Sequence, residues 1–272
     1  MQTQCGPHVI GEEQRALSLQ LREELKDILP FNDCNKLSDE DLSYRFLIAR
    51  KWDVPAAATM LRSYLAWRAE EQLDTICTES FPEDFSRCMG AGYEGFDVEG
   101  RPVMWQKPNP TDVAYLLQNY DVPALTRWHH YVIERGRERY RLGGQDRLTI
   151  VLDVADIGLN VLTNLSAMSV FKEMTASDQA HFPEHMRQMF IINAPWFFSK
   201  MWNVVKRWLD ERSQKKIQIW GSNYGQPLQE FIAPDQIPAQ YGGQGLDWKS
   251  VPAEGAKYEP PPKERLRPPR FS

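Results

Sequence analysis

The sequence lacks the features that identify several large classes of protein. Its 272 residues include four cysteines, and none of them forms a C-x-x-C pair or a regular spacing. Neither a disulfide framework nor a cysteine-based zinc site is therefore expected. No stretch approaches the ~18 consecutive apolar residues that a membrane-spanning helix needs. The N-terminus has no basic segment followed by an apolar run, so no signal peptide is expected and a cytoplasmic protein is predicted.

A basic excess and the common catalytic motifs are also missing. The net charge of -5 argues against a nucleic-acid partner. There is no glycine-rich phosphate loop and no G-x-S-x-G elbow, so we predict that the protein is not an enzyme. Asp153 and Asp156, at the end of a predicted strand, are assigned to a turn rather than to acid–base catalysis. His181 and His185 have the spacing of zinc ligands, but Pro183 lies between them, and no metal is expected.

The first part of the chain has a helical pattern. Ser38, followed three residues later by Asp41, predicts a capped helix start. Pro55 is typical of the first turn of the next helix. Apolar residues recur at helical spacing on either side of these signals. We predict an N-terminal helical lobe over residues 12–78, with helices over 12–29, 41–52 and 55–71.

The pattern changes after residue 78. Glycine and aromatic residues surround Gly100, which predicts a turn between two strands. Three β-branched runs then alternate with helical segments, which favours an α/β domain with a mostly parallel sheet. This domain is predicted over 79–248. The proline-rich residues 249–272 are predicted to form an extended tail.

The most informative segment is residues 195–211, PWFFSKMWNVVKRWLDE. On a single helix its aromatic and apolar side chains share one face, and basic residues lie toward the other. One interpretation is a helix that packs on the sheet as an ordinary crossover. The other is a helix that closes a pocket or contacts a membrane. The apolar residues are Trp196, Phe197, Phe198, Met201, Trp202, Val205, Trp208 and Leu209, and the basic ones are Lys200, Lys206 and Arg207.

These blocks together resemble the CRAL-TRIO family and, within it, the fungal phosphatidylinositol/phosphatidylcholine transfer proteins. The resemblance covers residues 35–245 and is densest from His181 to Asp210, HFPEHMRQMFIINAPWFFSKMWNVVKRWLD. It implies a helical lobe followed by an α/β lipid-binding domain, whose mostly parallel sheet floors an apolar pocket closed by a gate helix. The aromatic segment takes the place of that gate and of the membrane contact.

The resemblance also implies a set of residues for an inositol-phosphate head group. The glutamate of the family's Y-P-E-R-M block falls on Glu184. The arginine and lysine of its R-A-R-K block fall on Arg50 and Lys51. Cations suit the phosphodiester and a carboxylate suits the inositol hydroxyls. For Glu184 and Lys216 the alternative to lipid binding is an ion pair between the two that only supports the fold. The implied head-group residues are Arg50, Lys51, Glu184, Asp210, Ser213 and Lys216.

The sequence departs from the family at the positions that recognise choline. Leu148 and Ile150 replace a serine and a threonine on a strand, and Gly90, Ala91 and Gly92 replace most of a tyrosine cluster, leaving Tyr93. Aromatic faces hold quaternary ammonium groups. Leu148, Ile150 and Tyr93 are therefore predicted to line the pocket wall, and phosphatidylcholine is a doubtful second ligand.

The resemblance leads to one main hypothesis and two alternatives. The main hypothesis is a monomeric carrier that needs no cofactor besides its bound phospholipid, phosphatidylinositol. It would associate transiently with endomembranes and present its lipid to lipid kinases. One alternative is a carrier of a non-phospholipid hydrophobe such as a sterol. The other is a lipid-regulated scaffold.

Overall fold

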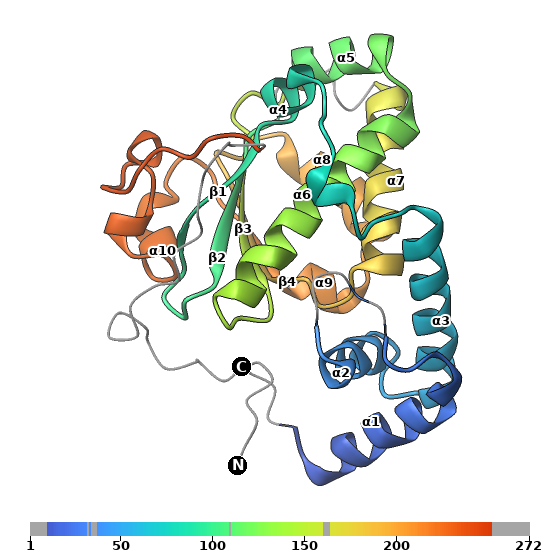
Figure 1. Ribbon diagram of the computed structural model, residues 1–272. Coiled ribbons are helices and arrows are strands. Elements are labelled where there is room, and N and C mark those ends of the chain that lie inside the picture. Colours follow the sequence, from blue (N-terminus) through green and yellow to red (C-terminus); the bar gives the residue numbers. More distant parts are fainter. Residues whose placement is uncertain (1–9, 32, 34–36, 109, 160–163, 252–272) are drawn as a thin grey trace. The chain divides into compact units, whose positions relative to one another are not determined.

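The computed structural model describes residues 10–31, 33, 37–108, 110–159 and 164–251, with the backbone alone over 110–114. Most of the predicted tail, Cys5 and Cys34 lie outside the described residues, and Cys77 and Cys88 take part in no disulfide. Within this part of the chain, residue contacts separate two compact units. The first comprises residues 10–79 and 177–185, and the second comprises 80–176 and 186–251. Figure 1 shows the elements of both.

The first unit is helical. Ser38 caps α2 by accepting the amide N–H of Asp41, and Asp53 caps α3 in the same way with Ala56. These contacts confirm both predicted helix starts. A single apolar core joins the helices, with Leu21, Phe46 and Leu61 almost completely buried. The elements are α1 (Glu12–Glu24), η1 (Lys26–Ile28), α2 (Asp39–Ala49), α3 (Val54–Glu70) and η2 (Ile76–Thr78).

Two of these helices end earlier than the sequence pattern predicts. The first was expected to reach residue 29, but α1 ends at Glu24 and a short 3₁₀ turn follows. Leu29 is extended, which is the conformation favoured directly before a proline such as Pro30. The second was expected to reach Trp52, but α2 ends at Ala49 and Trp52 is left-handed.

The second unit is a mixed α/β layer structure, as predicted. Its sheet has the order β1-β2-β3-β4-β5, with β1 antiparallel to β2 and the other neighbours parallel. The strands are β1 (Ala91–Phe96), β2 (Pro102–Gln106), β3 (Leu148–Asp153), β4 (Met186–Ile192) and β5 (Ile217–Ile219). The helices are α4 (Glu83–Met89), α5 (Pro110–Asn119), α6 (Val122–Leu142), most of α7 (Leu165–His181), α8 (Phe198–Val205), α9 (Glu211–Lys215) and α10 (Gly225–Gln229). Short 3₁₀ turns are η4 (Lys206–Trp208), η5 (Pro234–Gln236) and η6 (Ala239–Tyr241).

The two faces of this sheet belong to different apolar clusters. Strand side chains alternate between faces, so Val151 and Phe190 pack with Leu228 of α10. Their neighbours Leu152 and Ile191 pack with α8 on the other side. In Figure 1, α6 crosses the strands, and α8 and α10 lie on opposite sides of the sheet. Among the described helices, none is long and apolar enough to cross a membrane.

The aromatic segment is shorter as a helix than the sequence pattern predicts. Continuous helix was expected from Pro195 to Glu211, but α8 occupies only its middle, and Trp196 precedes the helix. A new helix starts soon after, because the Asp210 carboxylate caps α9 by accepting the backbone amides of Arg212 and Ser213. The Gln214 side-chain amide then donates to the carbonyl oxygens of Lys206 and Leu209 at 2.8 and 2.9 Å.

Candidate functional site

The sheet face under α8 is the candidate site because its apolar side chains are incompletely covered. Leu152 belongs to the central strand β3, yet it is only half-buried, as is Met189 on β4. On the opposite face, Val151 and Phe190 from the same two strands are almost completely buried. Central strands of a parallel sheet are normally covered on both faces. Ile217, Ile219, Met168, Trp202 and Trp208 complete this half-buried apolar surface.

Two predicted wall residues extend this face toward the start of β3. Leu148 and Ile150 alternate with buried Thr149 and so share the face of Leu152; both are buried. Tyr93 lies beside Leu148, because a Cβ added at Gly136 of α6 would meet both side chains. The Tyr93 hydroxyl donates to the Val132 carbonyl oxygen at 2.6 Å. Gly136 is thus the close approach that lets α6 pack over this end of the face.

The segment predicted as the gate covers the same face with its buried side. Phe198, Met201 and Val205 of α8 are buried against Leu152 and Ile191. Phe197 is also buried, whereas Trp202, Trp208 and Leu209 are half-buried. Trp196 differs from the rest, with 80% of its surface exposed. Lys200 and Arg207 are exposed, and Lys206 is half-buried.

Three of the six predicted head-group residues come together in the second unit, around α9. The Ser213 hydroxyl donates to the Asp210 carboxylate at 2.6 Å. Burial acts to raise the pKa of Asp210, but the hydrogen bonds from Ser213 and Arg212 and the charge of Lys216 outweigh it and lower that pKa. The Lys216 ammonium donates to the Met186 carbonyl oxygen at 3.1 Å, at the start of β4. Asp210 is therefore ionised and lies within the field of the Lys216 ammonium.

The other three predicted head-group residues belong to the first unit. Arg50 and Lys51 are exposed at the end of α2. Glu184 sits in a turn after α7 with a backbone φ of 56°, a left-handed conformation that is costly for any residue with a Cβ. Such strain concentrates where a side chain has to be aimed.

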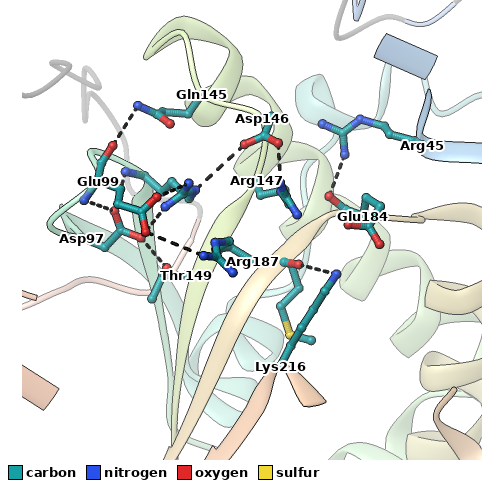
Figure 2. Close-up of polar contacts among 12 residues, drawn as sticks. Arg45, Asp97, Glu99, Gln145, Asp146, Arg147, Thr149, Glu184, Arg187 and Lys216 are labelled. Atoms are coloured by element: carbon teal, nitrogen blue, oxygen red, sulfur yellow. Dashed lines mark hydrogen bonds and ion pairs between the residues drawn. The ribbon is translucent and has the colours of Figure 1, made fainter. Parts of the chain in front are cut away.

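Sequence reasoning missed the residue that holds this turn. Arg45 of α2 is 8% exposed, and its guanidinium donates to the Glu184 carbonyl oxygen at 2.8 Å (Figure 2). Arg45 therefore positions Glu184 through its backbone. A signal was present in the sequence, since Arg45 falls among the apolar residues Leu42, Phe46 and Leu47 of a buried helix.

A buried polar network fixes the hairpin turn of the second unit to the neighbouring strand. Asp97 accepts the amides of Glu99 and Arg101, which closes the turn, and accepts the Thr149 hydroxyl at 2.7 Å. Burial raises the pKa of Asp97 despite the nearby Arg101 guanidinium. Arg187 of β4 reaches Glu99 at 3.8 Å (Figure 2). These contacts order the amino ends of β3 and β4.

The groups considered for catalysis or metal binding have structural partners. The Asp153 carboxylate accepts hydrogen bonds from the backbone amide of Ala155 and the side-chain amide of Asn193. These contacts stabilise the turn that follows β3. His181 stacks on Trp67 at 3.7 Å, and burial lowers its pKa to about 4, so it is neutral near pH 7. Among the described residues, no group of three or more histidine, cysteine, aspartate or glutamate side chains is arranged to hold a metal ion.

Comparison with known proteins decides the family. A model of the CRAL/TRIO domain matches residues 87–243, more than half of the chain, and a model of the CRAL/TRIO N-terminal domain matches residues 19–63. The chain belongs to the CRAL/TRIO family. This confirms the resemblance, and the helical region with a mostly parallel five-stranded sheet confirms the predicted α/β class.

The relatives of this CRAL/TRIO protein include lipid transfer proteins. It is 32% identical over 221 residues to "Phosphatidylinositol/phosphatidylcholine transfer protein SFH4" of Arabidopsis thaliana, covering 76% of this chain but only 36% of that protein. It is 29% identical over 254 residues to "Sec14 cytosolic factor" of Schizosaccharomyces pombe, covering 87% and 84%. The crystal structure of Sfh5 has the same fold, with a TM-score of 0.63 at 18% identity over 80% and 84% of the two chains.

Proposed function

We propose that this CRAL/TRIO protein is a non-enzymatic lipid carrier whose main ligand is phosphatidylinositol. The observation that carries the proposal is the half-buried apolar face around Leu152, Met189 and Ile217 under α8. A lipid tail bound on this face would bury the apolar surface that the protein's own side chains leave partly exposed. The name of the relative SFH4, a phosphatidylinositol/phosphatidylcholine transfer protein, supports the same class of ligand.

The energetics of lipid transfer favour such an apolar surface. Exposing a diacyl tail to water costs about 0.8 kcal/mol per methylene, or about 25 kcal/mol for about 30 methylenes. Movement from a bilayer to an apolar protein surface avoids that cost. Exchange then becomes close to neutral in free energy when α8 moves aside at a membrane.

The proposed head-group ligands are the residues described above in the two units. In the second unit, Lys216, which donates to the Met186 carbonyl oxygen, would neutralise the phosphodiester. In the first unit, Arg50 and Lys51 are proposed as further cations. Glu184, aimed by a strained turn, would accept inositol hydroxyls, and Asp210 with Ser213 would complete the set.

We propose membrane contact through the segment that carries α8. Trp196 is 80% exposed, and exposed Lys200 and Arg207 lie on the same segment. Each basic residue near an anionic bilayer contributes about 1 kcal/mol, which suits reversible docking. Peripheral association with endomembranes, a cytoplasmic location, a monomeric state and presentation of the lipid to kinases belong to this proposal.

The test is transfer of labelled phosphatidylinositol between vesicles, together with native mass spectrometry of the lipid that copurifies. The double variant Glu184→Ala with Lys216→Ala should lose transfer and keep its melting temperature, because both charges are proposed to serve the lipid head group and not the fold. Lys215→Ala, an exposed neighbour of the same charge, is the matched control. Absence of transfer by folded wild-type protein would refute the proposal.

A carrier of a neutral hydrophobe is the second candidate function. It is favoured by Leu148 and Ile150, which put two buried apolar side chains on the face where a polar head group needs hydroxyls. In that case the double variant would carry its ligand as well as wild type does, because a neutral ligand needs neither charge. A sterol in the copurified lipid would identify this outcome directly.

A further inference from the structure

Arg187, at the start of β4, is a largely buried arginine whose hydrogen-bond donors are unused. Its side chain is 21% exposed, and its one polar contact within the described part of the chain is with the Glu99 carboxylate at 3.8 Å. That distance is too long for a hydrogen bond. Its Nε atom is buried and has no hydrogen-bond partner among the described residues. A guanidinium carries several N–H donors, and buried donors normally find acceptors, so this arrangement needs an explanation.

An irregularity in the pairing of β4 places Arg187 in this position. Leu148 and Thr149 are consecutive on β3, but their partners on β4 are residues 186 and 188. Arg187 is therefore an extra residue on β4, as in a β-bulge. Such a residue bends its strand and re-aims its side chain, and bulges are over-represented next to active sites. The side chain of Arg187 is thus released from the regular alternation of the strand.

The carboxylate nearest to Arg187 is held mainly by another arginine. Glu99 contacts the Arg101 guanidinium at 2.7 Å, which is much closer than its 3.8 Å contact with Arg187. Coulomb attraction falls with distance, so Glu99 compensates the charge of Arg101 more than that of Arg187. Arg187 therefore keeps positive charge and hydrogen-bond donors that an external anion can use.

A second cation lies beside the same part of β4. The Lys216 ammonium donates to the Met186 carbonyl oxygen at 3.1 Å, and Met186 directly precedes Arg187. Figure 2 shows both basic side chains at this end of the strand. Because Lys216 is proposed above to neutralise the phosphodiester, Arg187 lies on the head-group side of a bound inositol lipid. Two cations suit two phosphate groups, and a guanidinium binds a phosphate through paired N–H donors.

We propose that Arg187 is a specificity-determining residue that binds a phosphate group on the inositol ring, so that the protein carries phosphatidylinositol monophosphates as well as phosphatidylinositol. A phosphate in this place would accept the N–H donors that the protein leaves unused. An inositol hydroxyl would gain less there, because charge-assisted hydrogen bonds are the stronger kind. The inference rests on the proposed function, since it names a further lipid for the same carrier.

The experiment compares transfer of phosphatidylinositol and of each phosphatidylinositol monophosphate by wild type and by Arg187→Gln. Donor vesicles have equal surface charge, so that docking on the bilayer is the same for every lipid. We expect wild type to transfer at least one monophosphate, and Arg187→Gln to lower the ratio of monophosphate to phosphatidylinositol transfer about tenfold, equivalent to about 1.4 kcal/mol. Arg187→Lys should give an intermediate ratio, because an ammonium keeps the charge but lacks the paired donors. Lys215→Gln, which removes an exposed charge next to Lys216, is the matched control and should leave the ratio unchanged.

The outcomes separate this inference from the proposed function. Wild type that transfers phosphatidylinositol but no monophosphate would overturn the role of Arg187 and leave the carrier function standing, and so would an unchanged ratio in Arg187→Gln. Failure of folded wild type to transfer either lipid would refute the carrier function itself. Calorimetry with inorganic phosphate distinguishes a free anion from a lipid: binding that depends on Arg187, without monophosphate transfer, would overturn the proposal in favour of a soluble ligand. If Arg187→Gln does not fold, the transfer by wild type still decides.

Discussion

Replacing Glu184 by glycine should make the protein more stable and less active at once. The backbone φ of Glu184 is 56°, in the left-handed region. That conformation raises the free energy of the folded state by about 1–2 kcal/mol for a residue with a Cβ, whereas glycine adopts it without this strain. Arg45 holds the turn through the Glu184 carbonyl oxygen, a contact that survives any change of side chain.

The magnitude follows from comparing Glu184→Gly with Glu184→Ala. Both variants lack the carboxylate, but alanine keeps the backbone strain. Relief of this strain by glycine increases the free energy of unfolding by about 1–2 kcal/mol. The greater conformational freedom of glycine in the unfolded chain decreases it by about 0.5–1 kcal/mol. The glycine variant should therefore be more stable by about 0.5–1 kcal/mol, which raises the melting temperature by about 2 °C for a chain of this size.

The assay is a thermal melt of each variant followed by vesicle transfer of phosphatidylinositol. Gln72→Gly is the control, because Gln72 is exposed, has a φ of 50° and lies in the same unit. It should gain similar stability and keep full transfer. A melting temperature of Glu184→Gly at or below that of Glu184→Ala would refute the strain argument. Unchanged transfer by Glu184→Gly would remove Glu184 from the head-group set.

Three further changes probe the apolar face, α8 and the hairpin network. Leu148→Ser with Ile150→Thr should raise phosphatidylcholine transfer at a cost of about 1–3 kcal/mol for each new buried hydroxyl; unchanged choline transfer by a folded variant would contradict it. Trp202→Asp should cut transfer by about tenfold and keep the bound lipid, because a carboxylate opposes contact with an anionic bilayer. The exposed neighbour Asn203→Asp should have a smaller effect, and loss of soluble Trp202→Asp protein would instead indicate a core helix. Thr149→Val should lower stability by about 1–3 kcal/mol, because its hydroxyl serves a buried carboxylate at 2.7 Å, and an unchanged melting temperature would contradict this.

The sequence by itself determined the helix starts, the hairpin and the class of the fold. Ser38 caps its helix through contacts within a few residues, and Gly100 is left-handed in the turn where the glycine was noted. Such signals are local, because the groups that make each hydrogen bond are neighbours in the chain. The β-branched runs likewise predicted strands, since each is rich in apolar residues that favour strands. Recognition of the family drew on the order of these blocks.

Tertiary structure alone decided which apolar residues remain half-covered and which charges have partners. The stripe of residues 195–211 predicted one long helix, but α8 ends at Val205, and Asp210 and Gln214 then make contacts that the apolar period does not encode. Leu152 and Val151 look equally apolar in the sequence, yet only the packing of α8 and α10 makes one half-buried and the other buried. Arg45 meets Glu184 across 139 residues, and Arg187 reaches Glu99 only because the hairpin turn lies beside the start of β4. Contacts of this range depend on how the elements pack, and no local pattern of residues records them.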